Sequence, residues 1–219
     1  MISVAPLTPD RWDHFAQLCR AMGPNRSCYC LWWREVGRPA AGGRRARAQQ
    51  LVAESPRPIG VLAYDGVQPV GWAAVAPRLD FPRLNRGRDT APVGAVEGVF
   101  VVPCFFVVES HRHQGVAREL LAAAVEQARR LGALAVEGVP GDPLTEERTP
   151  SASYTGTVGL FRAAGFKEVA RRSRSSNRDK WVTGVRTTGR AGGLRDDPGS
   201  CFPATSRTRP GLTVGSTGS

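Results

Sequence analysis

The sequence feature that most constrains the fold is an almost continuous apolar run from Val96 to Val108. The run is rich in β-branched and aromatic residues, which favour strands. A strand that is apolar at nearly every position must be covered on both faces, because alternate side chains point to opposite sides of the sheet. Pro103 lies inside the run and lacks a backbone donor, so we expect the strand to bulge or splay there. The run therefore predicts the central strand of a sheet with helices on both faces.

The segments around this run supply the expected helices and further strands. Hydrophobic periodicity, turn residues and helix-start residues predict the order strand, two helices, hairpin, central strand, helix, strand, helix, strand. The expected helices cover about residues 8–19, 44–54, 118–131 and 155–164, and the expected strands cover 2–5, 60–64, 70–75, 96–108, 133–139 and 166–170. The polar segment 77–92 is punctuated by prolines and is predicted to be a loop. This order predicts a single α/β domain with a mixed, mostly antiparallel sheet.

The formal net charge of +11 is concentrated near the C-terminus. Residues 1–170 hold 20 basic and 16 acidic side chains, whereas residues 171–219 hold 10 and 3. The last stretch is rich in Gly, Ser, Thr and Arg and cannot bury enough surface to offset its ordering entropy. We therefore expect a domain over residues 1–182 and a disordered basic tail over 183–219. The basic charge then predicts at most weak nucleic-acid contacts of the tail.

Composition also bears on the cellular location of the protein and argues against disulfide bonds and a metal site. The sequence has no run of eighteen apolar residues, which predicts no membrane span, and its first ten residues do not resemble a secretory signal. We therefore expect a cytoplasmic protein. The odd number of cysteines argues against a disulfide framework, and their spacing does not predict a metal site. They are Cys19, Cys28, Cys30, Cys104 and Cys201.

The turn after the central strand carries the clearest chemical signal. In Arg112-His113-Gln114-Gly115-Val116-Ala117 a glycine and small residues come just before the predicted amphipathic helix. Gly115 allows backbone torsions that a Cβ would disfavour. Successive amides of such a turn point into one concavity, and the positive end of the helix dipole adds to them. This pattern is compatible with pyrophosphate binding and equally with an ordinary strand-to-helix turn.

With its context, the turn resembles the acyl-CoA-binding motif of the GNAT superfamily of N-acetyltransferases, Arg-x-x-Gly-x-Ala. The segment Leu160–Phe166 is similar to the late helix of that family, which ends in a Gly-Phe step. Three more segments resemble a bacterial branch of the superfamily: Cys28–Arg34, Pro103–Val107 and Val136–Pro140. The resemblance covers about residues 2–182. It implies a GNAT-like domain with splayed central strands and acetyl-CoA as co-substrate.

The resemblance also implies which residues bind acyl-CoA. The turn amides would hold the pyrophosphate, and backbone groups of the preceding strand would pair with the pantetheine arm. The expected binding residues are Phe105, Phe106, Val107, Arg112, His113, Gln114, Gly115, Val116 and Ala117. The splay at Pro103 would open the gap into which the thioester reaches. The same two phenylalanines are also compatible with simple core packing.

The acid and base of the reaction are less clear from the sequence. Many family members place a proton-donating tyrosine on the late helix, where this chain has Phe161. Tyr154 lies about two helical turns earlier, where the family often has an asparagine that steadies the pantetheine, and it could replace either role or neither. The thiolate could also leave without a dedicated acid, since it is only modestly basic. Glu97 and Glu137 are the candidate bases, because both are predicted on or beside central strands, where burial raises a carboxyl pKa. A salt-bridged, structural glutamate is an equally good interpretation of Glu137.

The first functional hypothesis is transfer of an acetyl or other short acyl group from acyl-CoA to an amine in a ternary complex, by a monomer or homodimer. The acceptor site is expected among the N-terminal helices, the 77–92 loop and the Trp32-Trp33 pair. The main alternative is a non-catalytic acyl-CoA-binding module, which the missing tyrosine favours. Nucleic-acid association through the tail and a dinucleotide-binding fold are weaker alternatives, since the first strand has no Gly-x-Gly-x-x-Gly.

Overall fold

The computed structural model describes residues 1–36, 43–141, 154–173 and 180–187. A seven-stranded sheet runs through these residues in the order β1-β2-β3-β4-β5-β7-β6. Its strands are β1 (Ile2–Pro6), β2 (Gly60–Asp65), β3 (Gln68–Pro77), β4 (Val99–Val107), β5 (Ala135–Gly138), β6 (Lys167–Ser173) and β7 (Lys180–Thr187). β4 and β5 are parallel, and all other neighbours in this sheet are antiparallel. The predicted mixed, mostly antiparallel sheet is confirmed.

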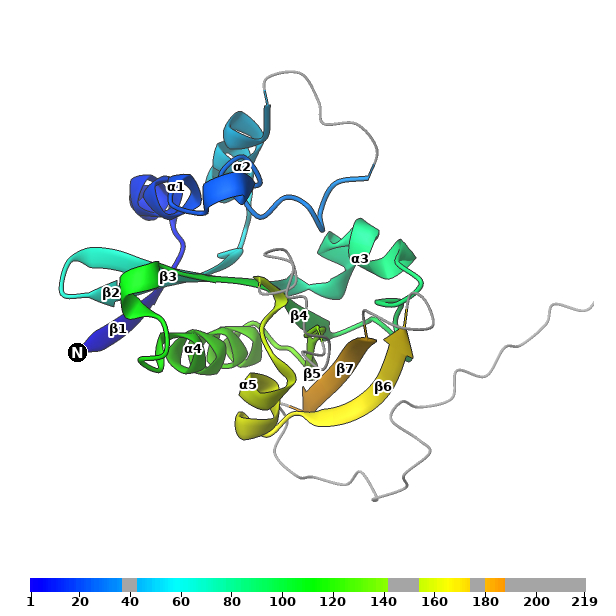
Figure 1. Cartoon of the computed structure of the whole chain (residues 1–219). Coiled ribbons are helices and arrows are strands. Elements are labelled where there is room, and N and C mark those ends of the chain that lie inside the picture. The colour runs from blue at the N-terminus through cyan, green and yellow to red at the C-terminus, as the bar shows by residue number, and fades with distance from the viewer. Residues whose placement is uncertain (37–42, 142–153, 174–179, 188–219) are drawn as a thin grey trace, which may run out of the picture.

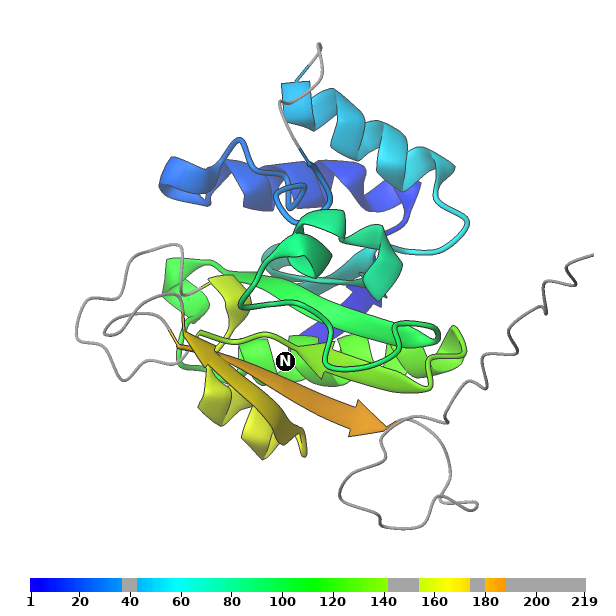
Figure 2. The same cartoon turned by 90° about the vertical axis from the view of Figure 1, so that its right-hand side faces the viewer.

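Helices cover both faces of the sheet, as Figure 1 shows and Figure 2 repeats from the side. One face carries α1 (Trp12–Arg20), α2 (Gly43–Glu54) and α3 (Pro82–Arg86), and we call it the α1 face. The other face carries α4 (Val116–Arg130) and α5 (Val158–Ala163), and we call it the α4 face. The predicted cover on both sides of the central strand is therefore confirmed.

A separate hydrophobic core fills each face. On the α1 face, Trp72 of β3 is fully buried, and the ring of Phe15 from α1 lies 4.5 Å from its ring. On the α4 face, Leu120 and Leu121 belong to the apolar stripe of α4 that packs on the sheet. Each fully buried side chain of this size contributes roughly 2 kcal/mol of hydrophobic stabilisation. The two cores fix the sheet between its helical layers.

Pro103 interrupts β4 as the sequence predicts. Ala74 pairs with Cys104 and Ala76 pairs with Val101, so β4 holds one residue more than β3 over this stretch. The side chain of Val102 lies in the core of the α4 face, and that of Cys104, two residues on, lies in the core of the α1 face. In a regular strand, residues two apart point to the same face, so this change of face is typical of a β-bulge. The bulge at Pro103 is confirmed.

The central strands part directly after this bulge. β4 pairs with β5 only between Val99–Val102 and Ala135–Gly138. β5 ends there, whereas β4 continues to Val107. The expected splay of the central strands is confirmed.

The segment 77–92 is more ordered than the sequence suggests, and the prediction of a plain loop is wrong. It contains the 3-10 helix η3 (Arg78–Asp80) and the short helix α3. Pro82 occupies the first position of α3. A proline starts a helix well at this position, because its fixed φ suits the helix and no acceptor needs its missing N–H.

β7 crosses the predicted boundary between domain and tail. Its antiparallel pairing with β5 continues to Thr187, five residues beyond the expected end of the domain at 182. The sequence gives little sign of this strand because polar residues and Gly184 interrupt its apolar positions. The rest of the predicted tail, residues 188–219, lies outside the described residues.

Within the described residues, no helix has the length and apolar character needed to cross a membrane. The same residues contain no group of three or more His, Cys, Asp or Glu side chains arranged to hold a metal ion. The four cysteines in the described part are all free thiols, and three of them are buried: Cys19, Cys30 and Cys104. Cys201 lies outside the described part.

Candidate active site

Beyond the bulge, β4 is paired on one side only. β3 lies along one edge, and no strand of the described chain pairs with the other. The amide of Val108 donates to the Val70 carbonyl at 3.0 Å, and in an antiparallel pair successive residues direct their backbone groups to alternate sides. The N–H and C=O groups of Phe106 therefore point toward β3, whereas those of Phe105 and Val107 point to the open side. This edge can pair with an extended ligand that carries amides.

The open edge leads into the predicted turn, residues 112–117. Gly115 adopts the left-handed region with φ of 85° directly before α4, and a Cβ there would meet no atom within 4 Å. Within the described chain, no backbone carbonyl accepts a hydrogen bond from the amides of residues 113–117. These are the orphan donors expected at a helix start, and the 15-residue helix behind them adds its dipole. The turn therefore offers a concentrated anion-binding surface.

Side-chain hydrogen bonds connect this turn to the strand before it. The Arg112 Nε donates to the Val107 carbonyl at 3.2 Å, and the Gln114 Nε2 donates to the Ser110 carbonyl at 2.8 Å. His113 is exposed and has a φ of 60°. Val116, in contrast, is buried in the core of the α4 face. The structure thus brings the nine predicted cofactor residues together along one path, from the open edge of β4 to the start of α4.

Phe161 closes the gap on the α4 face. Its ring lies 5.9 Å from that of Phe105 and 4.9 Å from that of Phe166, each in edge-to-face contact. A Cβ built on Gly138, the last residue of β5, would overlap the Phe161 ring. The phenylalanine therefore occupies the space between the parting strands and fixes their separation. It has no polar atom to exchange a proton.

Tyr154 lies on the other face. Its ring stacks on Phe106 at 6.3 Å with an interplanar angle of 18°, and its hydroxyl donates to the Met22 carbonyl at 3.1 Å. The helix predicted over residues 155–164 is shorter in the structure. α5 begins only at Val158. The tyrosine thus stands on the α1 face beside the open edge of β4, and Phe161 stands on the α4 face.

Glu137 is part of a buried ion pair. It is 3% exposed, and its carboxylate accepts a hydrogen bond from Arg78, which is fully buried and also donates to the Thr90 carbonyl. Burial raises the pKa of Glu137, and the charge of Arg78 opposes that rise. Removing one partner of such a pair typically costs about 3–5 kcal/mol. This geometry favours the structural interpretation of Glu137, since the pair joins the end of β3 to β5.

Glu97 is far from the other candidates. It is exposed in the turn before β4, and one of its carboxylate oxygens accepts a hydrogen bond from the Val96 amide at 3.1 Å. β4 begins only at Val99, and the extended chain from Val99 to Pro103 already spans about 13 Å. The structure does not bring Glu97 to the gap between β4 and β5.

The structure also reveals site residues that the sequence did not single out. Arg78 lies in the segment that was predicted as a loop. Its position directly after a strand is the only sequence signal for its ion pair with Glu137. Cys30 accepts a hydrogen bond from the Trp72 indole at 3.0 Å, and its sulfur lies 3.4 Å from that of Cys104. These contacts hold the Cys28–Arg34 segment against the bulge of β4. They join positions 42 and 74 residues apart, which no local pattern predicts.

Two parallel strands part beside a bulge, and the open edge leads to a turn lined with free amides. This arrangement is expected of transferases that use acyl-CoA. The family model for the acetyltransferase (GNAT) family matches residues 25–140, more than half of the 219 residues. The chain belongs to the GNAT acetyltransferase family. No curated protein matches the sequence.

Solved structures of this family share the fold. An N-acetyltransferase from Staphylococcus aureus Mu50 has a TM-score of 0.55 at 11% identity, over 86% of this chain and 99% of that one. The structure of yncA from Salmonella typhimurium with its cofactor acetyl-CoA has a TM-score of 0.51 at 15% identity, over 91% and 99%. The aminoglycoside acetyltransferase AAC(6')-Ib in complex with coenzyme A has a TM-score of 0.51 at 16% identity, over 85% and 95%. At these identities the likeness shows the fold.

Proposed function

We propose that the protein transfers an acetyl or other short acyl group from acyl-CoA to an amine. The observation that carries this proposal is the continuous path from the open edge of β4 to the turn at 112–117. The backbone groups of Phe105 and Val107 are placed to pair with the amides of pantetheine. The free amides of the turn are placed to bind the pyrophosphate. Gly115 keeps that concavity open because a side chain there would project into it.

The chemistry proposed is direct transfer between two bound substrates. The amine nitrogen attacks the thioester carbonyl carbon, a C–N bond forms, and the C–S bond breaks. The nitrogen loses one proton, and the leaving thiolate gains one. The role proposed for the chain is to hold the amine next to the thioester carbonyl, and such positioning is a large part of the rate acceleration in these transfers.

We propose Tyr154 as the group that protonates the leaving thiolate. Its ring flanks the open edge through Phe106, and its hydroxyl is held by the Met22 carbonyl. A thiolate is only modestly basic, so the phenol need only assist its departure and a strong acid is not required. Glu137 is assigned to positioning, since its carboxylate is already committed to Arg78. We expect the acceptor amine to bind on the α1 face. We also expect the protein to act in the cytoplasm.

A calorimetric titration of acetyl-CoA into the full chain tests the proposal, with NAD as the control ligand. Saturable binding of acetyl-CoA together with no binding of NAD is the expected result. A panel of amines with detection of the released thiol then tests the transfer. Absence of acetyl-CoA binding in a folded sample would overturn the proposal.

The second candidate is a non-catalytic acyl-CoA-binding module of the same fold. The observation that favours it is Phe161, which stands where many relatives have a proton donor and has none to give. Binding of acetyl-CoA without thiol release for any amine of the panel is the result expected of such a module. Thiol release with any one amine excludes it.

A further inference from the structure

Arg34 stands on the α1 face above the point where β4 and β5 part. Its guanidinium lies 4.3 Å from the centre of the Phe81 ring. Phe81 packs with Val101 of β4, which is the residue before the last pair with β5. The Cys30–Cys104 contact holds the same N-terminal segment against β4. The guanidinium is therefore fixed over the place that the thioester would reach.

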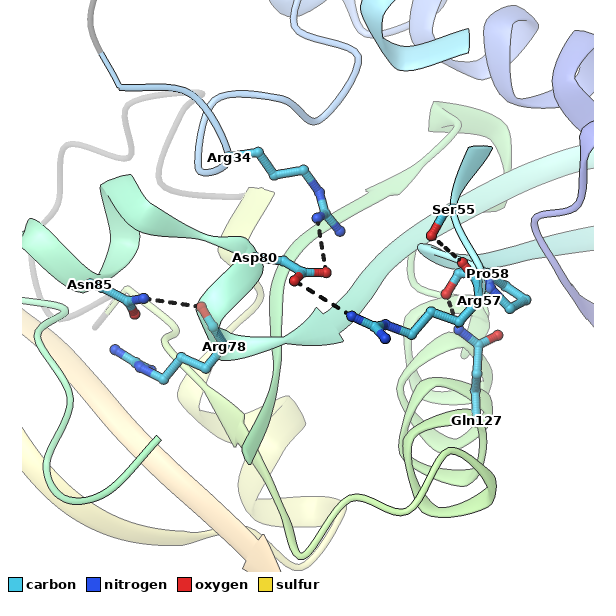
Figure 3. Close-up of polar contacts among 8 residues, drawn as sticks. All are labelled: Arg34, Ser55, Arg57, Pro58, Arg78, Asp80, Asn85 and Gln127. Carbon is cyan, nitrogen blue, oxygen red and sulfur yellow. Dashed lines mark hydrogen bonds and ion pairs between the residues drawn. The ribbon is translucent and has the colours of Figure 1, made fainter. Parts of the chain in front are cut away.

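This guanidinium is buried but not fully paired. The Arg34 side chain is 10% exposed, and within the described residues its Nη2 has no hydrogen-bond partner. Its Nη1 reaches Asp80 at 3.5 Å, and Arg57 reaches the other oxygen of the same carboxylate at 3.6 Å (Figure 3). Charge-assisted hydrogen bonds are usually about 2.8 Å long. One carboxylate is thus shared loosely between two arginines, and a positive charge is left over.

The chain segments around Arg34 on the α1 face also carry an excess of positive charge. Residues 20–36, 43–57 and 78–90 together contain eleven arginines and four acidic residues. Residues 109–134, which include α4, contain four arginines and three acidic residues. The excess of positive charge therefore lies on the face from which the acceptor would approach. Such a field concentrates anionic ligands.

We propose that Arg34, together with Arg57, binds a carboxylate of the acceptor, so that the substrate is an amine that also carries a carboxylate. This inference rests on the proposed acyl transfer. A guanidinium fork matches a carboxylate with two parallel N–H···O bonds, and Nη2 supplies the donor that Asp80 leaves unused. The exposed parts of Asp80 and Arg57, 30% and 36% of each side chain, provide the route from solvent.

The test compares acceptors that differ only in the anionic group. Amino acids are compared with their C-terminal amides, and phosphoethanolamine is compared with ethanolamine. Each compound is titrated into protein saturated with CoA and then assayed for thiol release with acetyl-CoA. The variants are Arg34→Gln, Arg57→Gln and, as the matched control, Arg45→Gln. Arg45 is exposed on α2 of the same face. Its substitution changes the net charge as much as the other two do, but it leaves the cluster of Arg34, Arg57 and Asp80 unchanged.

The expected result is a preference of at least about tenfold for amino acids over their amides. In Arg34→Gln and Arg57→Gln that preference falls to about twofold or less, with acetyl-CoA affinity unchanged, whereas Arg45→Gln keeps it. Equal use of neutral amines, a preference for the phosphate compound alone, or an unchanged preference in both cluster variants would overturn the proposal. If Arg34→Gln does not fold, Arg57→Gln decides the outcome alone, because its side chain is partly exposed.

Failure of the underlying transfer is distinguishable from failure of this site. If the wild-type protein binds no acetyl-CoA, the proposed function is wrong. The carboxylate site is then judged from the titrations into free protein alone. Binding of amino acids that Arg34→Gln removes still supports it, and absence of such binding overturns it.

Discussion

Gly115 and Gly132 form a natural comparison for the cofactor turn, because they flank the two ends of α4 in the same backbone conformation. Their φ angles are 85° and 83°, and a Cβ at either would meet no atom within 4 Å. Alanine at each position is therefore expected to cost only the backbone strain of the left-handed region, about 1–2 kcal/mol. The 15-residue helix between them is about 22 Å long, so Gly132 is remote from the turn.

Substitution by glutamate is expected to lower the affinity for acetyl-CoA at position 115 but not at position 132. Gly115→Glu places a carboxylate among the free amides of residues 113–117, where it competes with a pyrophosphate. The loss of about two charge-assisted hydrogen bonds, each of about 1.5–3 kcal/mol, predicts at least a ~100-fold loss of acetyl-CoA affinity. Gly132→Glu is expected to keep wild-type affinity. It loses a further ~0.3–1 kcal/mol of stability, since a negative charge is unfavourable at a helix C-terminus.

Urea unfolding of each variant measures the stability, and calorimetry with acetyl-CoA measures the affinity. The two alanine variants should unfold at similar urea concentrations. Wild-type affinity in a folded Gly115→Glu protein would place the cofactor elsewhere. An equal loss of acetyl-CoA affinity in Gly132→Glu would show that the loss comes from a general effect on α4 and not from a charge in the concavity of the turn.

Three further substitutions test the parts around the gap. Gly138→Ala should lower the free energy of unfolding by about 1–3 kcal/mol, because its methyl group overlaps the Phe161 ring, and urea unfolding checks this. Arg78→Met should cost about 3–5 kcal/mol near neutral pH, because it leaves the Glu137 carboxylate buried without its partner. The pKa of that carboxyl in the folded variant then lies above its ordinary value of 4.5, so stability should be greatest in acid and fall as the pH rises, as unfolding at several pH values would show. Tyr154→Phe should cost only about 1 kcal/mol of stability but about 100-fold in kcat, and an unchanged kcat would remove Tyr154 from the chemistry.

Features encoded by neighbouring residues could be predicted from the sequence. The bulge follows from Pro103 alone, since a proline cannot complete the ladder of a central strand. The hairpin around Asp65-Gly66 and the start of α4 after Gly115 have equally local causes. For the same reason the candidate cofactor turn could be predicted from the sequence, because the binding proposed for it depends on consecutive backbone amides.

Features that depend on distant partners could not be predicted. Arg78 and Glu137 are 59 residues apart, and neither local pattern indicates the other. The proposed acceptor site also depends on distant partners, since Arg34 and Asp80 are 46 residues apart. The contact of Tyr154 could not be predicted either, since its hydroxyl donates to the carbonyl of Met22, 132 residues away in the sequence. The candidate cofactor turn was therefore accessible to sequence reasoning, whereas the surroundings of Glu137, Tyr154 and Arg34 required the fold.

The short pairing of β4 with β5 has a consequence for the stability of the sheet. Four residues of each strand join the half that contains β1 to β4 to the half that contains β5, β7 and β6. This seam is as short as the ladder between β5 and β7 and shorter than the ladder between β3 and β4. It should open more readily than the β3–β4 ladder, and its amides should exchange with solvent hydrogen early. An acyl-CoA molecule paired with the open edge would act as a missing strand. At a concentration one hundred times its Kd it would add about 2.7 kcal/mol to the stability of the folded chain. The supply of acyl-CoA in the cell would then determine how firmly the two halves hold together.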